Sequence, residues 1–300
     1  MNLLNEYRAT ISKLRPTVAA TLWHYCGHDS SEYLFKRGAD LSCRYVSFMD
    51  VDPQEIKVGS RAYIEYLKSH PRYSSVAGII ELNVKDNEWG IKDIGAMIPL
   101  TFSFTERPDS DYHWEKYAKN DGYAVAFSQR RLDIACDEVA RKDGVSLMLV
   151  PCFYKEKDQR EIEQIFNSLT EDLNDALSVL LHAKNYDSKE ARSAGLEILF
   201  AIRQMSLGIK GNDFKDDKEW RLVMVSPCNF RLDPDNGFRG TGLKRYCENN
   251  DLMYLMDGVA IAPKGNKTRL MDGLIKYGLQ VRKRSFKVYS VYDHANGGTQ

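Results

Sequence analysis

The start of the chain carries apolar residues at helical spacing, and a proline ends the pattern. Leu3, Leu4, Tyr7, Ile11 and Leu14 recur every three or four residues before Pro16. We therefore expect a lead helix within residues 1–16. The same spacing predicts a helix near residues 59–69 and two amphipathic helices within about residues 158–210, which would form a helical insertion between strands.

Other segments alternate apolar and polar residues, as strands do. We expect strands at residues 21–26, 41–48, 100–105, 122–127, 147–154, 217–224 and 258–262, and a last strand within residues 279–292. Residues 76–91 predict two further strands joined by a turn at residues 85–87. Short strands mixed with helices, without a βαβ repeat, favour an α+β fold in a single domain over residues 1–300.

The expected strand at residues 217–224 carries the most informative side chains. Because successive side chains of a strand point to opposite faces, Asp217, Glu219 and Arg221 share one face. The other face carries Trp220, Leu222 and Met224, which suit a core. Two carboxylates beside a guanidinium can hold a sugar hydroxyl and stabilise positive charge at an anomeric carbon. The competing interpretation is an exposed ion pair between Glu219 and Arg221 on an edge strand.

Composition narrows the classes of partner. The 42 Lys and Arg residues balance 42 Asp and Glu residues, so no overall field attracts nucleic acid or an anionic membrane. The N-terminal residues lack the pattern of a secretory signal, and no apolar run reaches the ~20 residues that span a bilayer. The six cysteines are scattered without a C-x-x-C pair, so we expect no metal site, no disulfide scaffold and a cytoplasmic location.

Two basic segments near the C-terminus allow a local interaction with nucleic acid or phosphate. Residues 282–287 combine basic and aromatic side chains that suit RNA or single-stranded DNA, whereas the acids nearby favour a solvated surface. Residues 264–269 precede an expected helix at residues 268–276 and could bind phosphate. They lack P-loop spacing, so a solvated turn is the simpler interpretation.

Four short segments, taken together in this order, resemble a known family. They are residues 22–25 (LWHY), 102–106 (FSFTE), 114–117 (WEKY) and 217–221 (DKEWR). They resemble a widespread bacterial family with an L-Y-H-Y-T opening, a C-F-S strand, a W-x-x-Y helix and an E-x-E-W-R strand. That family is itself similar to the ADP-ribosyltransferase superfamily. Cys26, Asp217 and the loop at residues 51–55 depart from its pattern, which has Thr or Ser for the first and Glu for the second.

The resemblance implies a fold, a substrate and a setting. The fold would be an α+β ADP-ribosyltransferase-like core of short mixed strands with flanking helices and the helical insertion. The activity would be NAD-dependent mono-ADP-ribosylation of RNA, DNA or protein, without a metal. In bacteria such an enzyme is often a toxin or an anti-phage effector, held by a partner such as an antitoxin or a chaperone. The alternatives are an NAD glycohydrolase, or a non-catalytic binding module on a degenerate ADP-ribosyltransferase fold.

The same resemblance and the chemistry of NAD assign roles around the acidic strand. Glu219, with Asp217 beside it, would be the catalytic carboxylate that stabilises the oxocarbenium-like state formed as nicotinamide leaves. Arg221 would lie next to these acids and contact NAD. Ser103 and Thr105 would support Glu219 by hydrogen bonds, although both are also ordinary strand residues by propensity.

The remaining candidates would bind NAD. His24 and Tyr25 on the first strand would contact the ribose or the adenine side, and either Trp114 or Tyr117 would stack on the nicotinamide ring. Each has a simpler interpretation, because His24 could be a hydrogen-bonded core histidine and the two aromatics could serve core packing.

Overall fold

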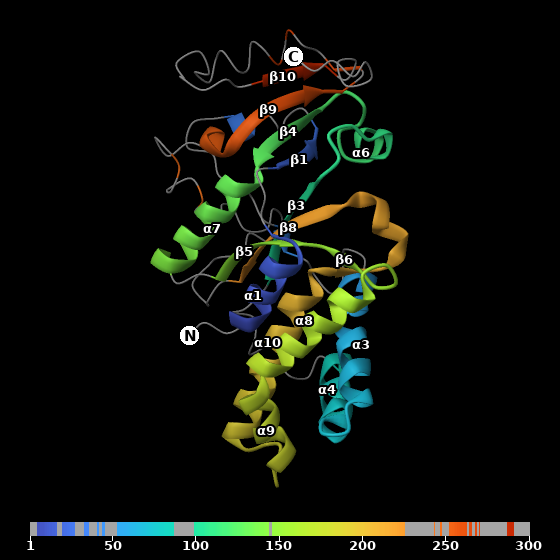
Figure 1. Cartoon of the computed structure of the whole chain (residues 1–300), viewed down its shortest axis with the longest axis vertical. Coiled ribbons are helices and arrows are strands. Elements are labelled where there is room, and N and C mark those ends of the chain that lie inside the picture. Colours follow the sequence, from blue (N-terminus) through green and yellow to red (C-terminus); the bar gives the residue numbers. More distant parts are fainter. Residues whose placement is uncertain are drawn as a thin grey trace.

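The computed structural model describes residues 5–16, 20–27, 33–35, 41, 44–45, 53–86, 99–143, 146–225, 243, 247, 252–262, 264–265, 268, 270 and 287–290. Over these residues a large sheet combines with helices, which confirms the α+β class. Figure 1 shows the strands of the sheet in the upper part of the molecule and a group of helices below it. The cavity described below lies on the sheet face that these helices cover in part.

Within the described residues, the main sheet has eight strands and a non-sequential order. Its path is β10 (Lys287–Ser290), β9 (Met256–Ile261), β4 (Tyr123–Ser128), β1 (Thr21–Cys26), β3 (Pro99–Thr105), β8 (Glu219–Val225) and β5 (Ser146–Pro151), and β2 (Arg44–Tyr45) pairs with β3. Neighbouring strands are antiparallel except β9 and β10, which are parallel. The expected strands at residues 21–26, 100–105, 122–127 and 258–262 are confirmed, as is a last strand within residues 279–292.

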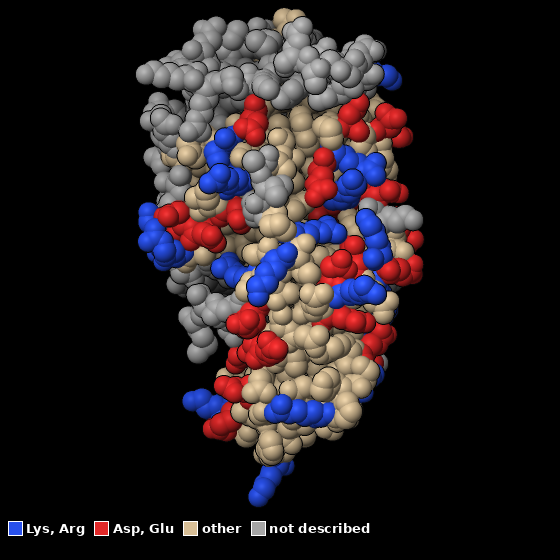
Figure 2. Space-filling view, in the orientation of Figure 1, with Lys and Arg blue, Asp and Glu red and all other residues tan. Residues whose placement is uncertain are grey.

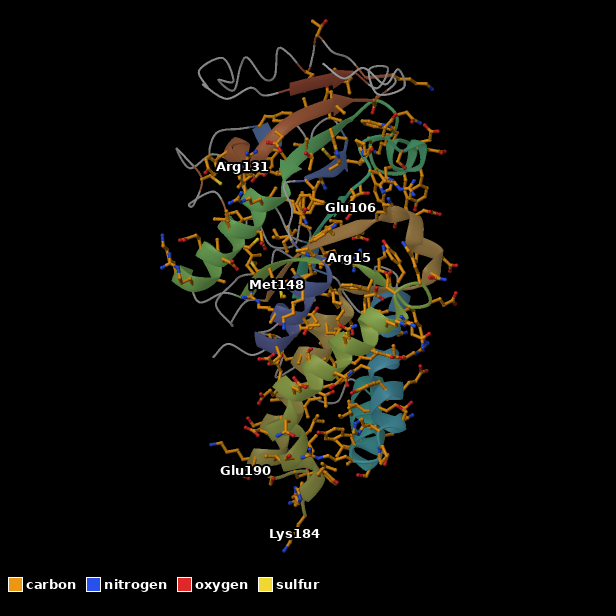
Figure 3. All side chains as sticks on the ribbon, in the orientation of Figure 1. Arg15, Glu106, Arg131, Met148, Lys184 and Glu190 are labelled. Atoms are coloured by element: carbon orange, nitrogen blue, oxygen red, sulfur yellow. The ribbon has the colours of Figure 1, made fainter. Side chains whose placement is uncertain are left out.

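One group of helices packs together below β5 and β8, and we refer to it as the helical part. It consists of α1 (Asn5–Leu14), α3 (Pro53–Ser69), α4 (Ser74–Asp86), α8 (Gln159–Asp172), α9 (Asn174–His182) and α10 (Lys189–Ser206). These helices share a core with Met148, Val150 and Val223 of the sheet. In Figure 3, Arg15 and Met148 lie where the helical part meets the sheet, and Lys184 and Glu190 lie at its far end. The insertion therefore packs with the lead helix and with α3 and α4 rather than forming a separate body.

A second core lies on the opposite face of the sheet, under α7 (Gln129–Asp143). Trp220, Leu222 and Met224 are buried in it, so the prediction that they face a core is confirmed. Helix α7 was not predicted, because its sequence is largely polar. Its inward face nevertheless has helical spacing in Leu132, Ala135, Cys136 and Val139, all of which are buried.

A third cluster of buried residues shares its sheet face with the helical part. It contains Trp23 and Tyr25 of β1, small residues of β4 and β9, and Trp114 of α6 (Asp111–Lys116). Trp23 pairs with Thr105, and Thr105 pairs with Glu219, so these three side chains lie in one row across β1, β3 and β8. The cavity lies on this row, between α6 and the residues of β7 (Ile209–Lys210) and the 3-10 helix η1 (Asn212–Asp217).

A small parallel sheet joins the insertion to the main sheet. The chain leaves through β6 (Phe153–Tyr154) into α8 and returns from α10 through β7 (Ile209–Lys210), and these two strands pair with each other. The predicted strand at residues 147–154 is confirmed for residues 147–151 and 153–154, but these form two strands in different sheets rather than one. Pro151 is the last residue to pair with β8, and Phe153 donates its N–H to Gly208 instead, so the chain changes partner around Cys152.

The prediction of two strands within residues 76–91 is wrong, because residues 74–86 form helix α4. The valines and isoleucines of this segment suggested strands. Tyr73, Val76, Ala77 and Ile80 are buried together, and their spacing of three, four and seven residues is that of one helix face. The period of the buried positions decides the element here, not the β-branched composition.

The insertion contains three helices rather than the two that were predicted. Leu173 separates α8 from α9 with φ −95° and ψ 5°, and it remains buried in the shared core. The predicted helix near residues 59–69 begins earlier, at Pro53. Most of the expected strand at residues 41–48, the expected helix at residues 268–276 and the basic stretch at residues 282–287 lie outside the described residues.

The charges of the molecule are mixed rather than segregated on the face that Figure 2 shows. Lys and Arg alternate with Asp and Glu over the described residues there. Among the helices that the structure describes, none is both long and apolar enough to cross a membrane.

Candidate functional site

A cavity of about 370 Å³ lies above β1, β3 and β8, between α6 and the segment formed by β7 and η1. Aromatic side chains line much of it, including Trp23, Tyr25 and Tyr117. Charged side chains come from the segment 210–221, which supplies Lys210, Asp217, Glu219 and Arg221. The site therefore combines apolar walls with a compact group of charges, as ligand pockets commonly do.

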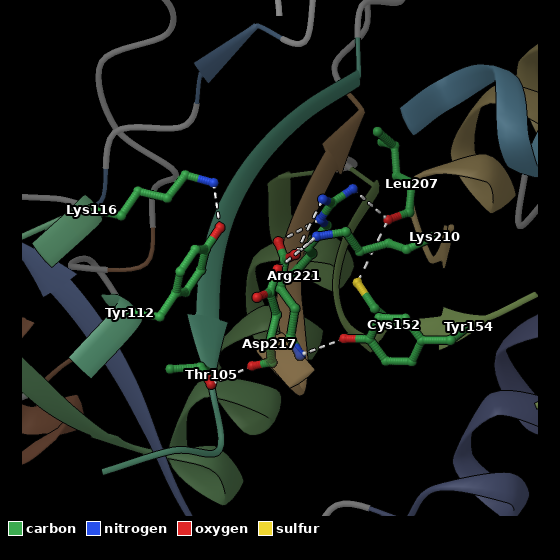
Figure 4. A network of polar contacts seen from close by, with 10 residues as sticks. Thr105, Tyr112, Lys116, Cys152, Tyr154, Leu207, Lys210, Asp217 and Arg221 are labelled. Atoms are coloured by element: carbon green, nitrogen blue, oxygen red, sulfur yellow. Dashed lines mark hydrogen bonds and ion pairs between the residues drawn. The ribbon is translucent and has the colours of Figure 1, made fainter. Parts of the chain in front are cut away.

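Glu219 is the first residue of β8, and its carboxylate is held from two sides. Its Oε1 accepts a hydrogen bond from Nε of Arg221 at 2.7 Å, and its Oε2 accepts one from Nζ of Lys210 at 2.5 Å. Its backbone N–H donates to the hydroxyl of Tyr154 at 3.1 Å. Glu219 is only 8% exposed. Figure 4 shows Lys210, Asp217 and Arg221 close together in this network of polar contacts.

Asp217 does not lie on β8, which corrects the prediction that three charged residues alternate along one strand. It ends the 3-10 helix η1 (Asn212–Asp217), and Lys218 then adopts a left-handed conformation with φ 44°. This turn still directs the carboxylate of Asp217 toward the cavity, where its Oδ2 accepts a hydrogen bond from Nζ of Lys210 at 3.3 Å. A non-glycine residue at positive φ is uncommon, so the two carboxylates are separated by a locally strained residue.

Lys210, Asp217, Glu219 and Arg221 form a buried cluster of two cations and two anions, called the ion cluster below. Nη1 of Arg221 also donates to the carbonyl oxygen of Leu207 at 2.9 Å. The interpretation as an exposed ion pair on an edge strand is wrong, because β8 lies between β3 and β5 and Arg221 is buried. Removing one partner of such a cluster leaves a buried charge without compensation.

The cluster sets the protonation state of Glu219. Burial by itself would raise the pKa of this carboxyl group, but the guanidinium of Arg221 and the ammonium of Lys210 outweigh it and lower the pKa from 4.5 to about 2. Glu219 is therefore an anion over the whole physiological pH range. It can accept a hydrogen bond or stabilise a positive charge, but it has no proton to donate as a general acid.

His24 borders the cavity, but its ring has partners of its own. The ring stacks on Phe102 with centroids 4.1 Å apart, and Phe102 packs against the core on the opposite face of the sheet. Its Nδ1 lies 2.9 Å from the carbonyl oxygen of Ser103, and because a carbonyl only accepts, this nitrogen carries the proton. His24 thereby joins β1 to β3, which otherwise pair only between Trp23 and Thr105 within the described residues.

The structure separates the two aromatic candidates at α6, Trp114 within the helix and Tyr117 directly after it. Trp114 is 1% exposed, its Nε1 donates to Asp109 at 2.6 Å, and it does not line the cavity. Tyr117 lines the cavity and is 43% exposed. Tyr25 also lines it, with its hydroxyl donating to the carbonyl oxygen of Arg107 at 3.1 Å and its ring edge-on to Trp114. Of Trp114 and Tyr117, only Tyr117 is placed to stack on a ligand.

Ser103 and Thr105 line the cavity but do not bond the carboxylate of Glu219. The hydroxyl of Thr105 donates to the carbonyl oxygen of Asp217 at 2.5 Å and accepts from the N–H of Arg107 at 3.1 Å. Thr105 therefore holds the turn that precedes Glu219, whereas Ser103 uses its carbonyl oxygen to hold His24. In the described part of the chain, the predicted support of Glu219 comes from Lys210 and Arg221 instead.

Sequence reasoning missed several cavity residues, of which Lys210 is the most important. Lys210 is 2% exposed, and its ammonium also lies 4.6 Å from the ring centroid of Phe214. His113 and Lys116 of α6 line the cavity as well, and the ammonium of Lys116 lies against the ring of Tyr117. Lys116 also donates to the hydroxyl of Tyr112 (Figure 4). Nothing in the local sequence marks Lys210, because it reaches the cavity only through the pairing of β6 with β7.

Other reactive groups in this region are not arranged for catalysis. Cys26 of β1 is buried, and burial raises the pKa of its thiol to about 12, so it is not a thiolate nucleophile. Over the residues that can be described, no group of three or more His, Cys, Asp or Glu side chains could hold a metal ion. Within the described residues, the carboxylate of Glu219 is bound by both cations of the ion cluster.

Comparison with known proteins gives one match. Residues 113–222 match the model of a family described as a protein of unknown function (DUF2971). The matched segment runs from α6 into β8 and includes Lys116, Tyr117, Lys210, Glu219 and Arg221. No curated protein and no solved structure matches the chain. The matched segment thus includes charged cavity residues of α6, β7 and β8, and the description of the family gives no function.

Proposed function

We propose that the protein cleaves the bond between nicotinamide and ribose in NAD and transfers ADP-ribose to a macromolecule, either RNA, DNA or protein. The observation that carries the proposal is the buried anion of Glu219 in the wall of an aromatic-lined cavity. The sequence resemblance to ADP-ribosyltransferases supports it, and the α+β sheet is compatible with a core of that kind.

The chemistry of the reaction suits an anionic carboxylate. When the C1′–N bond breaks, its electron pair goes to the pyridinium nitrogen and nicotinamide leaves as a neutral molecule. The ribose carbon becomes oxocarbenium-like and positively charged, and an oxygen or nitrogen nucleophile of the acceptor then bonds to it and releases a proton to solvent. A fixed anion in a water-poor wall stabilises this charge more strongly than one in bulk water does.

Glu219 retains capacity for one more hydrogen bond. A carboxylate has about four lone-pair positions. Within the described part of the chain, hydrogen bonds occupy three of them, namely those from Lys210 at 2.5 Å and from Arg221 at 2.7 Å and 3.3 Å. The fourth is available to a ribose hydroxyl, which places the anion next to the carbon that becomes positive.

The cavity is large enough for part of NAD but not for the whole molecule. Its volume of about 370 Å³ lies near the lower end of ligand pockets, which span roughly 300–1,000 Å³. We assign it to the nicotinamide and its ribose, with Tyr117 stacking on the ring from the mouth. His24 and Tyr25 would border the ribose, and Lys116 at the mouth would meet the negative pyrophosphate.

The ion cluster also favours a second interpretation. Its four charges are compensated within the cluster, as they would be in a purely structural element that joins β7, η1 and β8. In that case the protein is a non-catalytic binding module. Replacing Glu219 would then change stability only, so activity and stability must be measured on the same variants.

The experiment compares three proteins incubated with NAD labelled in its adenylate part and with cell lysate. They are the wild type, Glu219→Gln and the matched control Glu138→Gln, which changes an exposed acid of α7 that is paired with Arg141 and does not line the cavity. We expect nicotinamide release and a labelled product from the wild type and the control, and neither from Glu219→Gln. Circular dichroism checks that each variant is folded.

The label identifies the acceptor and separates the alternatives. Loss of label to protease indicates a protein acceptor, and loss to nuclease indicates RNA or DNA. Free ADP-ribose without a labelled macromolecule indicates an NAD glycohydrolase. A wild type that releases no nicotinamide contradicts the proposal and leaves the structural interpretation. Activity toward cellular macromolecules would fit a bacterial toxin or anti-phage effector that a partner protein restrains, and growth arrest on expression would test that role.

A further inference from the structure

Lys210 is the most buried charged residue of the cavity, and it comes from outside the main sheet. It lies on β7, where the chain returns from the helical insertion, and its ammonium contacts both carboxylates of the ion cluster. Its distance to Glu219 is 2.5 Å and its distance to Asp217 is 3.3 Å.

The two ends of the insertion supply several side-chain and backbone contacts that hold the start of β8. Tyr154, the last residue of β6, accepts the backbone N–H of Glu219. Leu207, just after α10, accepts a hydrogen bond from Arg221 through its carbonyl oxygen. Tyr154 pairs with Lys210 in the small parallel sheet, so these groups form one unit. The insertion is thus built into the site.

We propose that Lys210 is a positioning residue for Glu219, supplied by the returning strand of the helical insertion. The inference rests on the proposed function and assigns the insertion a role within it. Lys210 fixes the orientation of the carboxylate that faces the ribose, because its ammonium bonds Glu219 and Asp217 together.

Charged and titratable groups from five elements surround Glu219. Arg221 lies on its own strand, Lys210 on β7 and Asp217 at the end of η1. The hydroxyl of Tyr154 on β6 accepts a hydrogen bond from the backbone N–H of Glu219. Burial lowers the pKa of His113 on α6, and the negative charge of Glu219 partly offsets this effect. Among these, Lys210 is the group that bonds both acids, so its removal leaves Asp217 and Glu219 to repel each other beside the single cation Arg221.

The test compares steady-state NAD cleavage by Lys210→Met, Lys210→Arg and the wild type as a function of pH. Met has a similar shape to Lys without its charge, and Arg restores the charge. We expect Lys210→Met to lower kcat by about 10²-fold, the scale of a small misplacement of a catalytic group, with a smaller change in KM. We expect the acidic limb of the pH–rate profile of Lys210→Met to move to higher pH. In Lys210→Arg that limb should return to the wild-type position.

The matched control is Lys155→Met. Lys155 follows β6 directly, and its ammonium pairs on the surface with Glu65 at 3.5 Å, away from the cavity-lining residues. We expect this variant to keep the wild-type kcat and pH profile. If Lys210→Met does not fold, Lys210→Gln provides the same loss of charge while retaining hydrogen-bond donors.

The outcomes distinguish the two proposals. An inactive wild type contradicts the proposed function and, with it, the role of Lys210. An active wild type combined with a folded Lys210 variant of unchanged kcat and pH profile overturns only the role of Lys210. A lowered kcat without a displaced acidic limb also overturns it, because a structural contribution alone would leave the titration of Glu219 in place.

Discussion

The ammonium of Lys210 lies 2.5 Å from Oε2 of Glu219, although the two residues belong to different sheets. Lys210 is on β7 of the small parallel sheet, and Glu219 begins β8 of the main sheet. The contact closes the segment from Lys210 to Glu219, which contains η1 and the left-handed Lys218. The geometry of the cavity wall therefore depends on the joint between the helical insertion and the sheet.

Asp217 and its neighbour Asp216 allow a direct test of the ion cluster. Asp217 is buried against Lys210, whereas the side chain of Asp216 is 80% exposed and pairs with Arg107. We expect Asp217→Asn to lower the free energy of unfolding by about 1–3 kcal/mol, because it leaves excess positive charge in a buried site. Asp216→Asn should change it by less than about 0.5 kcal/mol. Urea denaturation measures both, and equal effects would contradict the buried cluster.

Tyr117 and Trp114 differ in what they contribute, although both belong to the W-x-x-Y segment. Trp114→Ala removes a fully buried ring and should cost about 3–5 kcal/mol of stability. Tyr117→Ala removes a ring that is 43% exposed at the cavity mouth, so the melting temperature should stay near that of the wild type. Under the proposed function it should weaken NAD binding by about tenfold through the lost stacking contact. Calorimetry of unfolding and of NAD binding checks the two effects separately, and unchanged NAD affinity would remove Tyr117 from the site.

The alternation along residues 219–224 could be read from the sequence, because period-two burial is a local property of a strand. Trp220 and Leu222 lie in the core, and Glu219 and Arg221 face the cavity, as the pattern predicts. Asp217 was misplaced for a reason that is also local. The left-handed Lys218 interrupts the strand, and lysine gives no signal for that conformation.

Lys210 could not be found in this way, because its position depends on two segments far apart in the chain. Three helices separate Tyr154 from Lys210 in the sequence, and the two residues become neighbours only in the folded chain. A lysine in a short strand is ordinarily exposed, and the sequence around it has no period that marks burial. The same limit applies to His113, since its position next to Tyr25 depends on how α6 packs on β1.

Gly59 and Gly78 test whether α3 and the insertion form one core. An added Cβ at Gly59 would lie 2.6 Å from Cα of Ser206 on α10, whereas at Gly78 of α4 it would meet nothing within 4 Å. We expect Gly59→Ala to separate α3 from α10 and to cost about 1–3 kcal/mol, since overpacking forces the backbone to move. Gly78→Ala should stabilise by about 0.5–1 kcal/mol, because alanine favours the helix. Thermal unfolding of both variants decides, and a neutral Gly59→Ala would contradict the close crossing of these helices.

The low pKa of Glu219 predicts how stability changes with acid. Its folded pKa of about 2 lies below its ordinary value of 4.5, so its ionisation stabilises the fold above about pH 4.5. That contribution, on the order of a few kcal/mol, is lost as the pH falls from about 4.5 to about 2. Glu219→Gln cannot titrate, so the difference in unfolding free energy between wild type and variant should be largest above pH 5 and should shrink below it, by urea denaturation at about 0.5-unit intervals. Glu138→Gln, at an exposed acid, should show a much smaller difference over the same range. A difference for Glu219→Gln that stays constant with pH would mean that the carboxylate is not held as an anion by Lys210 and Arg221.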